Sequence, residues 1–169
     1  NRFQNKRALV TGASSGIGQA LALTYYHAGY QLALVARRTT EIESWASRHN
    51  ITSNSYKIYS ANAANIDSIV AAGKACIAAQ GLPNVVIANA GISVGVDTAI
   101  REDLGQMAQT YATNNIGLAA TFHPFIDGML ARKSGKLVGI GSVAGIRGMP
   151  GHGAYCGSKA AVINYCESL

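Results

Sequence analysis

The sequence predicts an α/β fold in which a doubly wound parallel sheet is covered by helices on both faces. Short apolar segments alternate with longer segments of helical periodicity along the 169 residues. A glycine-rich turn joins the first of these strands to the first helix, and the later connections are long enough for crossovers between parallel strands. With 49% hydrophobic and 13% charged residues, residues 1–169 suit a single domain with one core of ordinary size.

The expected elements follow one another in alternation. Strands are predicted at residues 8–10, 31–36, 55–60, 85–88 and 136–140, and helices at 16–28, 39–49, 65–80, 102–133 and 154–169. Gly29 is a C-terminal stop for the first helix. The segment 102–133 is either one long helix or a broken pair, because Pro124 should interrupt it and Gly128 weakens it.

The turn Thr11–Gly18, with the sequence TGASSGIG, follows the first strand and opens the first helix. Gly12, Gly16 and Gly18 let the backbone turn sharply, approach a pyrophosphate and pack the helix close to the sheet. The turn therefore predicts a dinucleotide site on a Rossmann fold. A tight strand-to-helix connection without a ligand is the alternative, since the spacing is GxxxGxG rather than GxGxxG.

Two arginines, Arg37 and Arg38, follow the second strand, where a carboxylate would accept hydrogen bonds from the adenosine ribose. Guanidinium groups at this place pair instead with a 2'-phosphate. The sequence therefore favours NADP(H) over NAD(H), and a solvated basic loop is the alternative.

A possible proton-transfer set lies in the last third of the chain. Tyr155 and Lys159 are four residues apart, so they share one face of the helix predicted over 154–169. A nearby ammonium favours the phenolate form of a tyrosine and makes it a usable proton donor and acceptor. Ser142 follows the strand at 136–140, and strand ends are where α/β sheets place their ligands.

Composition argues against several other functions. The net charge is +6, but the basic residues are scattered and not interleaved with aromatic residues, which argues against nucleic-acid binding. No apolar segment approaches the length needed to span a bilayer. The three cysteines have no metal-ligand spacing, so no metal site is expected and a reducing, cytoplasmic setting fits best.

Five motifs in order resemble those of the short-chain dehydrogenase/reductase family, of the classical type. They are TGASSGIG at 11–18, NAG at 89–91, NNIG at 114–117, GSVAG at 141–145 and YCGSK at 155–159. The resemblance implies that Tyr155 is the general acid in carbonyl reduction, that Ser142 bonds the substrate oxygen and that Lys159 holds the nicotinamide ribose. Asn114 would complete a tetrad through a water relay, with Asn115 as the competing assignment.

The resemblance also extends the expected cofactor site. It implies contacts from the glycine turn, including Ser14, Ser15 and Ile17, and from the loop formed by Asn89, Ala90 and Gly91. Asn62 stands where many relatives have an aspartate that contacts the adenine; its amide still offers a donor and an acceptor. Tyr155 and Lys159 are expected to touch the cofactor as well.

The expected function is that of an NADP(H)-dependent oxidoreductase that interconverts a small-molecule carbonyl and alcohol. A non-catalytic dinucleotide-binding or sensing protein is the alternative, against which the intact Ser142, Tyr155 and Lys159 argue. Family members commonly associate through the helices at 102–133 and 154–169, so a homodimer or homotetramer is expected by resemblance. Family members also continue beyond the helix that ends here at Leu169, so we expect ordered sequence to be missing there; a partner covering the sheet edge is the alternative.

Overall fold

The computed structural model describes residues 6–169, whose five strands form one parallel sheet. The strands are β1 (Arg7–Thr11), β2 (Gln31–Ala36), β3 (Tyr56–Ser60), β4 (Val85–Ala88) and β5 (Lys136–Gly139). They lie in the order β3-β2-β1-β4-β5. The chain thus builds outward from β1 in both directions, and a crevice is expected where β1 and β4 meet, at their carboxyl ends.

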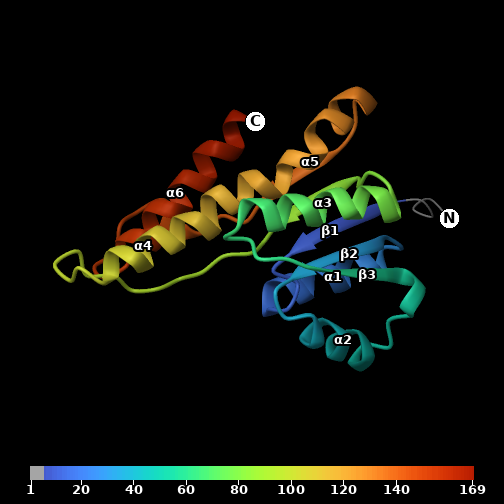
Figure 1. The fold of residues 1–169 in the computed structure, drawn as a ribbon, viewed down its shortest axis with the longest axis horizontal. Helices are drawn as coiled ribbons and strands as arrows, with labels where there is room; N and C mark the ends of the chain where they lie inside the picture. Colours follow the sequence, from blue (N-terminus) through green and yellow to red (C-terminus); the bar gives the residue numbers. More distant parts are fainter. Residues whose placement is uncertain (1–5) are drawn as a thin grey trace.

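Helices cover both faces of this sheet (Figure 1). The helices are α1 (Gly16–His27), α2 (Thr39–Arg48), α3 (Ile66–Gln80), α4 (Asp103–Tyr111), α5 (Gly117–Arg132) and α6 (Gly153–Ser168). Helices α1 and α2 pack on one face, while α3, α5 and α6 pack on the other. The predicted doubly wound fold is confirmed, and the predicted strands and helices are all present.

The core consists of two apolar layers, one on each side of the sheet. Alternate residues of β1 separate them: Leu9 belongs to the layer beneath α3 and α5, whereas Ala8 and Val10 belong to the layer beneath α1 and α2. Phe125 in α5 and Trp45 in α2 are almost fully buried anchors of the two layers. Because both faces are covered, the central strands are apolar between their ends, as at 8–10 of β1 and 32–36 of β2.

The expected interruption at Pro124 is wrong. Helix α5 runs through this proline, whose ring packs where α3 crosses at Gly73; a Cβ on Gly73 would lie 2.7 Å from Pro124 Cγ. The irregularity lies earlier, in the π-helical turn Ala112–Ile116 that joins α4 to α5. Packing against α3 therefore stabilises a proline that local propensity would reject.

The two edges of the sheet are formed by β3 and β5. Strand β5 is less buried than β4, which lies beside it, and its first residue, Lys136, is exposed. Within residues 6–169, no helix combines the length and the apolar character that crossing a bilayer requires.

Candidate active site

The glycine turn after β1 lies against the loop after β4. Gly12 has a φ of +62°, and a Cβ on it would lie 2.9 Å from the backbone nitrogen of Ala90. The side-chain amide of Asn89 donates to the carbonyl oxygen of Gly12 over 3.2 Å. A Cβ on Gly18 would overlap that same carbonyl. Glycine is therefore required here both for the backbone conformation and for the close approach of the two loops.

The side chain of Thr11, at the end of β1, holds the glycine turn and the loop after β4 together by hydrogen bonds. Its hydroxyl oxygen accepts hydrogen bonds from the backbone N–H groups of Asn89 and Ala90, at 3.0 and 3.1 Å. Thr11 is 1% exposed. The sequence analysis assigned no role to this residue, although it opens the TGASSGIG motif and its position at a strand end was the available signal.

Helix α1 begins at this turn without a side-chain cap. The N-cap residue is Ser15, but its hydroxyl donates to the carbonyl oxygen of Gly12 over 3.1 Å instead of capping the helix. The carbonyl of Ser14 accepts from the side chain of Gln19 over 3.1 Å. Helix N-termini attract anions through their N–H groups and the helix dipole, so the turn is suited to a phosphate.

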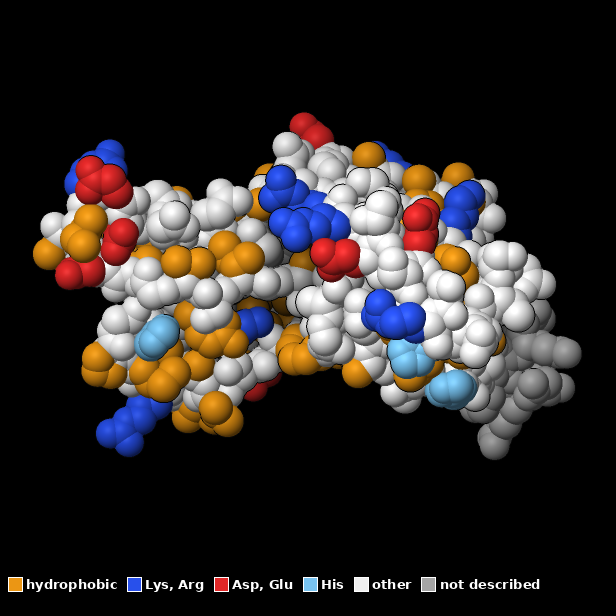
Figure 2. Space-filling view, turned by 90° about the horizontal axis from the view of Figure 1, so that it is seen from below, with side chains coloured by type: hydrophobic (Ala, Val, Ile, Leu, Met, Phe, Trp, Pro, Cys, Tyr) orange, Lys and Arg blue, Asp and Glu red, His pale blue; other side chains and the backbone are white. Residues whose placement is uncertain are grey.

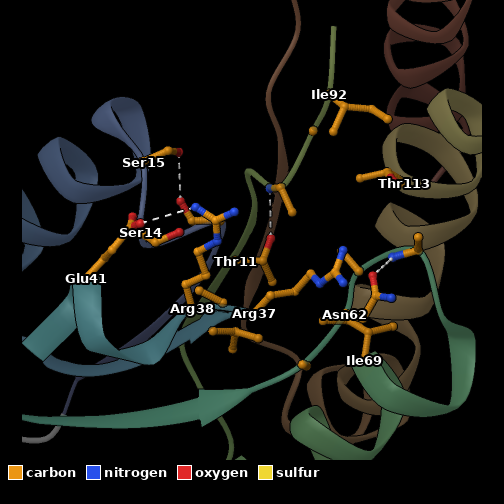
Figure 3. A pocket seen from close by; sticks show the side chains of 18 of the residues that line it. Thr11, Ser14, Ser15, Arg37, Arg38, Glu41, Asn62, Ile69, Ile92 and Thr113 are labelled. Atoms are coloured by element: carbon orange, nitrogen blue, oxygen red, sulfur yellow. Dashed lines mark hydrogen bonds and ion pairs between the residues drawn. The ribbon is translucent and has the colours of Figure 1, made fainter. Parts of the chain in front are cut away.

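A cleft of about 730 Å³ opens at the carboxyl ends of the strands. Figure 3 shows its side chains, with Arg38 extending toward Glu41 and Ser14 and Arg37 extending toward Asn62. Eight predicted cofactor residues line it: Gly12, Ser14, Ser15, Arg37, Arg38, Asn62, Ala90 and Gly91. Six predicted cofactor residues are not among the lining residues. Gly16, Ile17, Gly18 and Asn89 belong to the two loops that form the cleft, and Tyr155 and Lys159 lie in α6.

The two arginines differ in their surroundings. Arg38 Nη1 lies 3.6 Å from Glu41 Oε1, and among the described residues this is the only ion pair, so Arg37 has no carboxylate partner there. Basic side chains gather near the middle of the face in Figure 2, with a carboxylate beside them. Glu41 was not predicted as a site residue, although its place three residues after Arg38, in the first turn of α2, was the available signal.

Asn62 uses part of its hydrogen-bonding capacity within its own loop. Its Oδ1 accepts from the backbone N–H of Ala64 over 3.0 Å, and its backbone N–H donates to the hydroxyl of Ser68 over 2.9 Å. The side-chain amide nitrogen is left as the group that can donate toward a ligand.

Asn114 lies in the π-helical turn and is 2% exposed. Its amide nitrogen donates to the carbonyl oxygen of Ile92 over 2.9 Å and to the hydroxyl of Ser158 over 3.0 Å, and its Oδ1 accepts from the N–H of Ile92 over 2.8 Å. Asn115 makes a single such bond, from its amide nitrogen to the carbonyl of Ser158. Asn114 is thus the residue that joins α6 to the loop after β4.

Lys159 lies in α6 and is 8% exposed. Its Nζ donates to the carbonyl oxygen of Ile140, just beyond β5, over 3.0 Å and lies 5.8 Å from the centre of the Tyr155 ring. Burial lowers the pKa of the Lys159 ammonium, and the neighbouring Tyr155 opposes this shift. A cation and a phenol therefore lie side by side, as their spacing in the sequence predicted.

Gly91 connects this group to the cleft. It lines the cleft, and a Cβ on it would lie 3.2 Å from Asn114 Oδ1 and 3.6 Å from Lys159 Nζ. The absence of a side chain at residue 91 keeps the ammonium and the amide next to the cleft.

Ser142 follows β5 and begins the 3₁₀ turn Val143–Gly145. Its Oγ accepts from the N–H of Ala144 over 3.2 Å. Ser158, which is fully buried, was not predicted; its hydroxyl donates to the carbonyl of Tyr155 and accepts from Asn114. Its place inside the YCGSK motif was the available signal.

The comparisons with known proteins agree with this geometry. A sequence model described as short chain dehydrogenase matches residues 6–169. The chain belongs to the short-chain dehydrogenase/reductase family. Relatives of the chain bear the names of oxidoreductases, reductases and dehydrogenases.

Two relatives illustrate the similarity. A protein of Myxococcus xanthus named as an oxidoreductase is 34% identical over 97% of this chain and 64% of its own length. An acetoacetyl-CoA reductase of an Acinetobacter species is 32% identical over 98% of this chain and 67% of its own length. The chain spans roughly half to two thirds of the length of the curated relatives it matches.

Two solved structures share the fold. A metagenomic short-chain oxidoreductase in complex with NADP superposes with a TM-score of 0.90 at 25% identity, covering 99% of this chain and 76% of that one. A short-chain dehydrogenase/reductase from Burkholderia phymatum in complex with NAD gives 0.88 at 26% identity, covering 99% of this chain and 60% of that one. Both NADP and NAD thus occur among the structural neighbours.

Proposed function

We propose that the protein is an NADP(H)-dependent oxidoreductase that interconverts a carbonyl and an alcohol, with Tyr155 as the general acid and base. The observation that carries the proposal is the buried ammonium of Lys159, which lies 5.8 Å from the Tyr155 ring and beside Gly91 at the cleft. Burying an ammonium costs stability, and groups whose pKa burial perturbs cluster at functional sites. Proton transfer is the use proposed for this pair.

The cleft fits a dinucleotide. Its walls combine the sharp Gly12 turn, the uncapped start of α1 and two guanidinium groups at the end of β2. The glycine turn with Ser14 and Ser15 would hold the pyrophosphate, and Asn62 would face the adenine. When bound, NADP(H) supplies or accepts the hydride.

NADP(H) is proposed over NAD(H) because of the charges beside the end of β2. Ala36 ends this strand, and Arg37 and Arg38 follow it, so the place of a ribose-binding carboxylate is taken by cations. Charge-assisted hydrogen bonds from guanidinium groups to a phosphate are worth about 1.5–3 kcal/mol each.

Each polar group of the site has a proposed task. Tyr155 passes its phenolic proton to the developing alkoxide in reduction and takes it back in oxidation. Lys159 favours the phenolate form by its charge and binds the nicotinamide ribose. Ser142 orients the substrate oxygen, and Asn114 supports a proton relay to Lys159.

A Tyr155→Phe variant tests the proton donor. We expect NADPH affinity to be retained while reduction of a panel of ketones, aldehydes and 3-oxoacyl thioesters is nearly abolished. Tyr165→Phe, in the same helix but 40% exposed, is the matched control and should keep full turnover. If Tyr155→Phe turns over as fast as the wild-type protein, Tyr155 is not the proton donor. If the wild-type protein binds NADPH but oxidises it with none of these substrates, a sensing role is favoured.

An Arg37→Ala variant tests the cofactor preference. Since Arg37 has no carboxylate partner among the described residues, its loss should weaken NADPH binding about ten-fold or more and leave NADH binding nearly unchanged. Arg48→Ala, at the end of α2 and outside the cleft lining, is the matched control. An equal loss for both cofactors removes the basis of the preference.

We further propose a cytoplasmic homodimer or homotetramer that associates through α4, α5 and α6. Leu104 and Met107 on α4 are 40% and 37% exposed, which is more than their apolar character favours. Light scattering of the purified protein measures the assembly directly, and a monomer at all concentrations would contradict this part of the proposal.

A further inference from the structure

The cleft that holds the two arginines also holds a carboxylate, to which the proposed cofactor preference gives no role. Glu41 lies in the first turn of α2 and lines the cleft together with Arg37 and Arg38. We infer that Glu41 is a specificity-determining residue that competes with the 2'-phosphate of NADP(H) for Arg38 and so limits the discrimination against NAD(H). This inference rests on the proposed function.

The contact between Glu41 and Arg38 makes the two arginines unequal. Glu41 Oε1 lies 3.6 Å from Arg38 Nη1, whereas no described carboxylate pairs with Arg37. In Figure 3, Arg38 extends toward Glu41 and Ser14, and Arg37 extends away from them toward Asn62. Before a cofactor binds, one guanidinium is already engaged and the other is available. A phosphate that reaches Arg38 must therefore share it with Glu41 or displace Glu41.

The carboxylate treats the two cofactors differently. A 2'-phosphate is an anion, so Glu41 repels it directly as well as competing for Arg38. The 2'-hydroxyl of NAD(H) is neutral and a hydrogen-bond donor, so the same carboxylate does not repel it. Glu41 therefore weakens the binding of NADP(H), which the arginines strengthen, and leaves the binding of NAD(H) unchanged.

The exposure of the pair sets the size of the effect. The side chains of Arg38 and Glu41 are 80% and 48% exposed, so solvent screens their attraction. Exposed pairs of this kind are weak, and releasing Arg38 from one should change an affinity by roughly two- to five-fold. Glu41 thus moderates the preference for NADP(H) and does not reverse it.

The test is a Glu41→Gln substitution in the full-length protein, with NADPH and NADH titrated separately. We expect NADPH to bind two- to five-fold more tightly, NADH to be unchanged, and the gain to shrink at high salt. Glu43→Gln is the matched control, because Glu43 is also exposed on α2 but does not line the cleft. It should change neither affinity.

A double substitution separates competition for Arg38 from a general charge effect. In an Arg38→Ala background only the direct repulsion between Glu41 and the 2'-phosphate remains, so Glu41→Gln should strengthen NADPH binding less than it does in the wild-type protein. The inference is overturned if the gain is undiminished in that background, if Glu41→Gln leaves the NADPH affinity unchanged, or if it weakens NADPH binding because Glu41 orients Arg38 productively. Each of these results leaves the proposed function standing, whereas equal wild-type affinities for NADPH and NADH would remove the proposed cofactor preference and this inference with it.

Discussion

Replacing Asn114 by alanine should cost far more stability than the same change at its neighbour Asn115. The Asn114 side chain makes three hydrogen bonds, two to the backbone of Ile92 and one to Ser158. At about 0.5–1.5 kcal/mol for each bond, their loss lowers the free energy of unfolding by about 1.5–4.5 kcal/mol. Asn115 makes one bond and its buried Oδ1 has no partner among the described residues, so its replacement should cost about 0.5–1.5 kcal/mol.

Urea denaturation of the two variants beside the wild-type protein measures the difference. Equal slopes of free energy against denaturant are needed for the comparison, since a changed slope indicates a changed denatured or native state. The reasoning is refuted if Asn115→Ala is as destabilising as Asn114→Ala.

Two further predictions concern packing and alkaline stability. A Cβ on Gly157 would overlap the hydroxyl of Tyr111, so Gly157→Ala should destabilise the wild-type protein. In a Tyr111→Phe background the same Cβ meets the ring at 3.5 Å, and alanine should then stabilise the helix by about 1 kcal/mol. Additive effects of the two substitutions on the free energy of unfolding in urea would contradict this prediction. Burial raises the pKa of the Cys76 thiol to about 11, so the folded state holds its proton to higher pH than the unfolded state, and the free energy of unfolding should fall as pH rises from about 9 to about 11. Cys76→Ala should reduce the fall in the free energy of unfolding between about pH 9 and 10. Tyr59, whose pKa burial raises to about 12, contributes only above this range. If the free energy of unfolding of Cys76→Ala falls with pH as steeply as that of the wild-type protein, the buried thiol is not its cause.

The elements and the glycine turn were predictable because each depends on neighbours in the sequence. The second strand and the fourth have the predicted bounds, 31–36 and 85–88, since turn signals flank both. Gly12 was assigned correctly to a sharp turn, and its positive φ agrees with the requirement for glycine. Local periodicity and turn chemistry carry this kind of information.

What the sequence did not predict depends on contacts between distant segments. Pro124 continues a helix because α3 crosses it at Gly73, some fifty positions earlier in the chain. Ser158 accepts a hydrogen bond from Asn114 only once α6 has packed against the π-helical turn. Neither contact leaves a periodic trace along the chain, so only the folded arrangement reveals it.

The π-helical turn fixes the number of residues between α4 and α5. Such a turn accommodates one residue more than regular α-helix would, and each residue of a helix advances the side chains by about 100°. Deleting one position within Ala112–Ile116 would therefore let this stretch form regular α-helix, with Phe122 and Phe125 still facing the interior, and would remove the bulge in which Asn114 lies. The extra residue consequently serves the placement of the Asn114 amide, and a shortened chain would lose the site while its hydrophobic interior stayed intact.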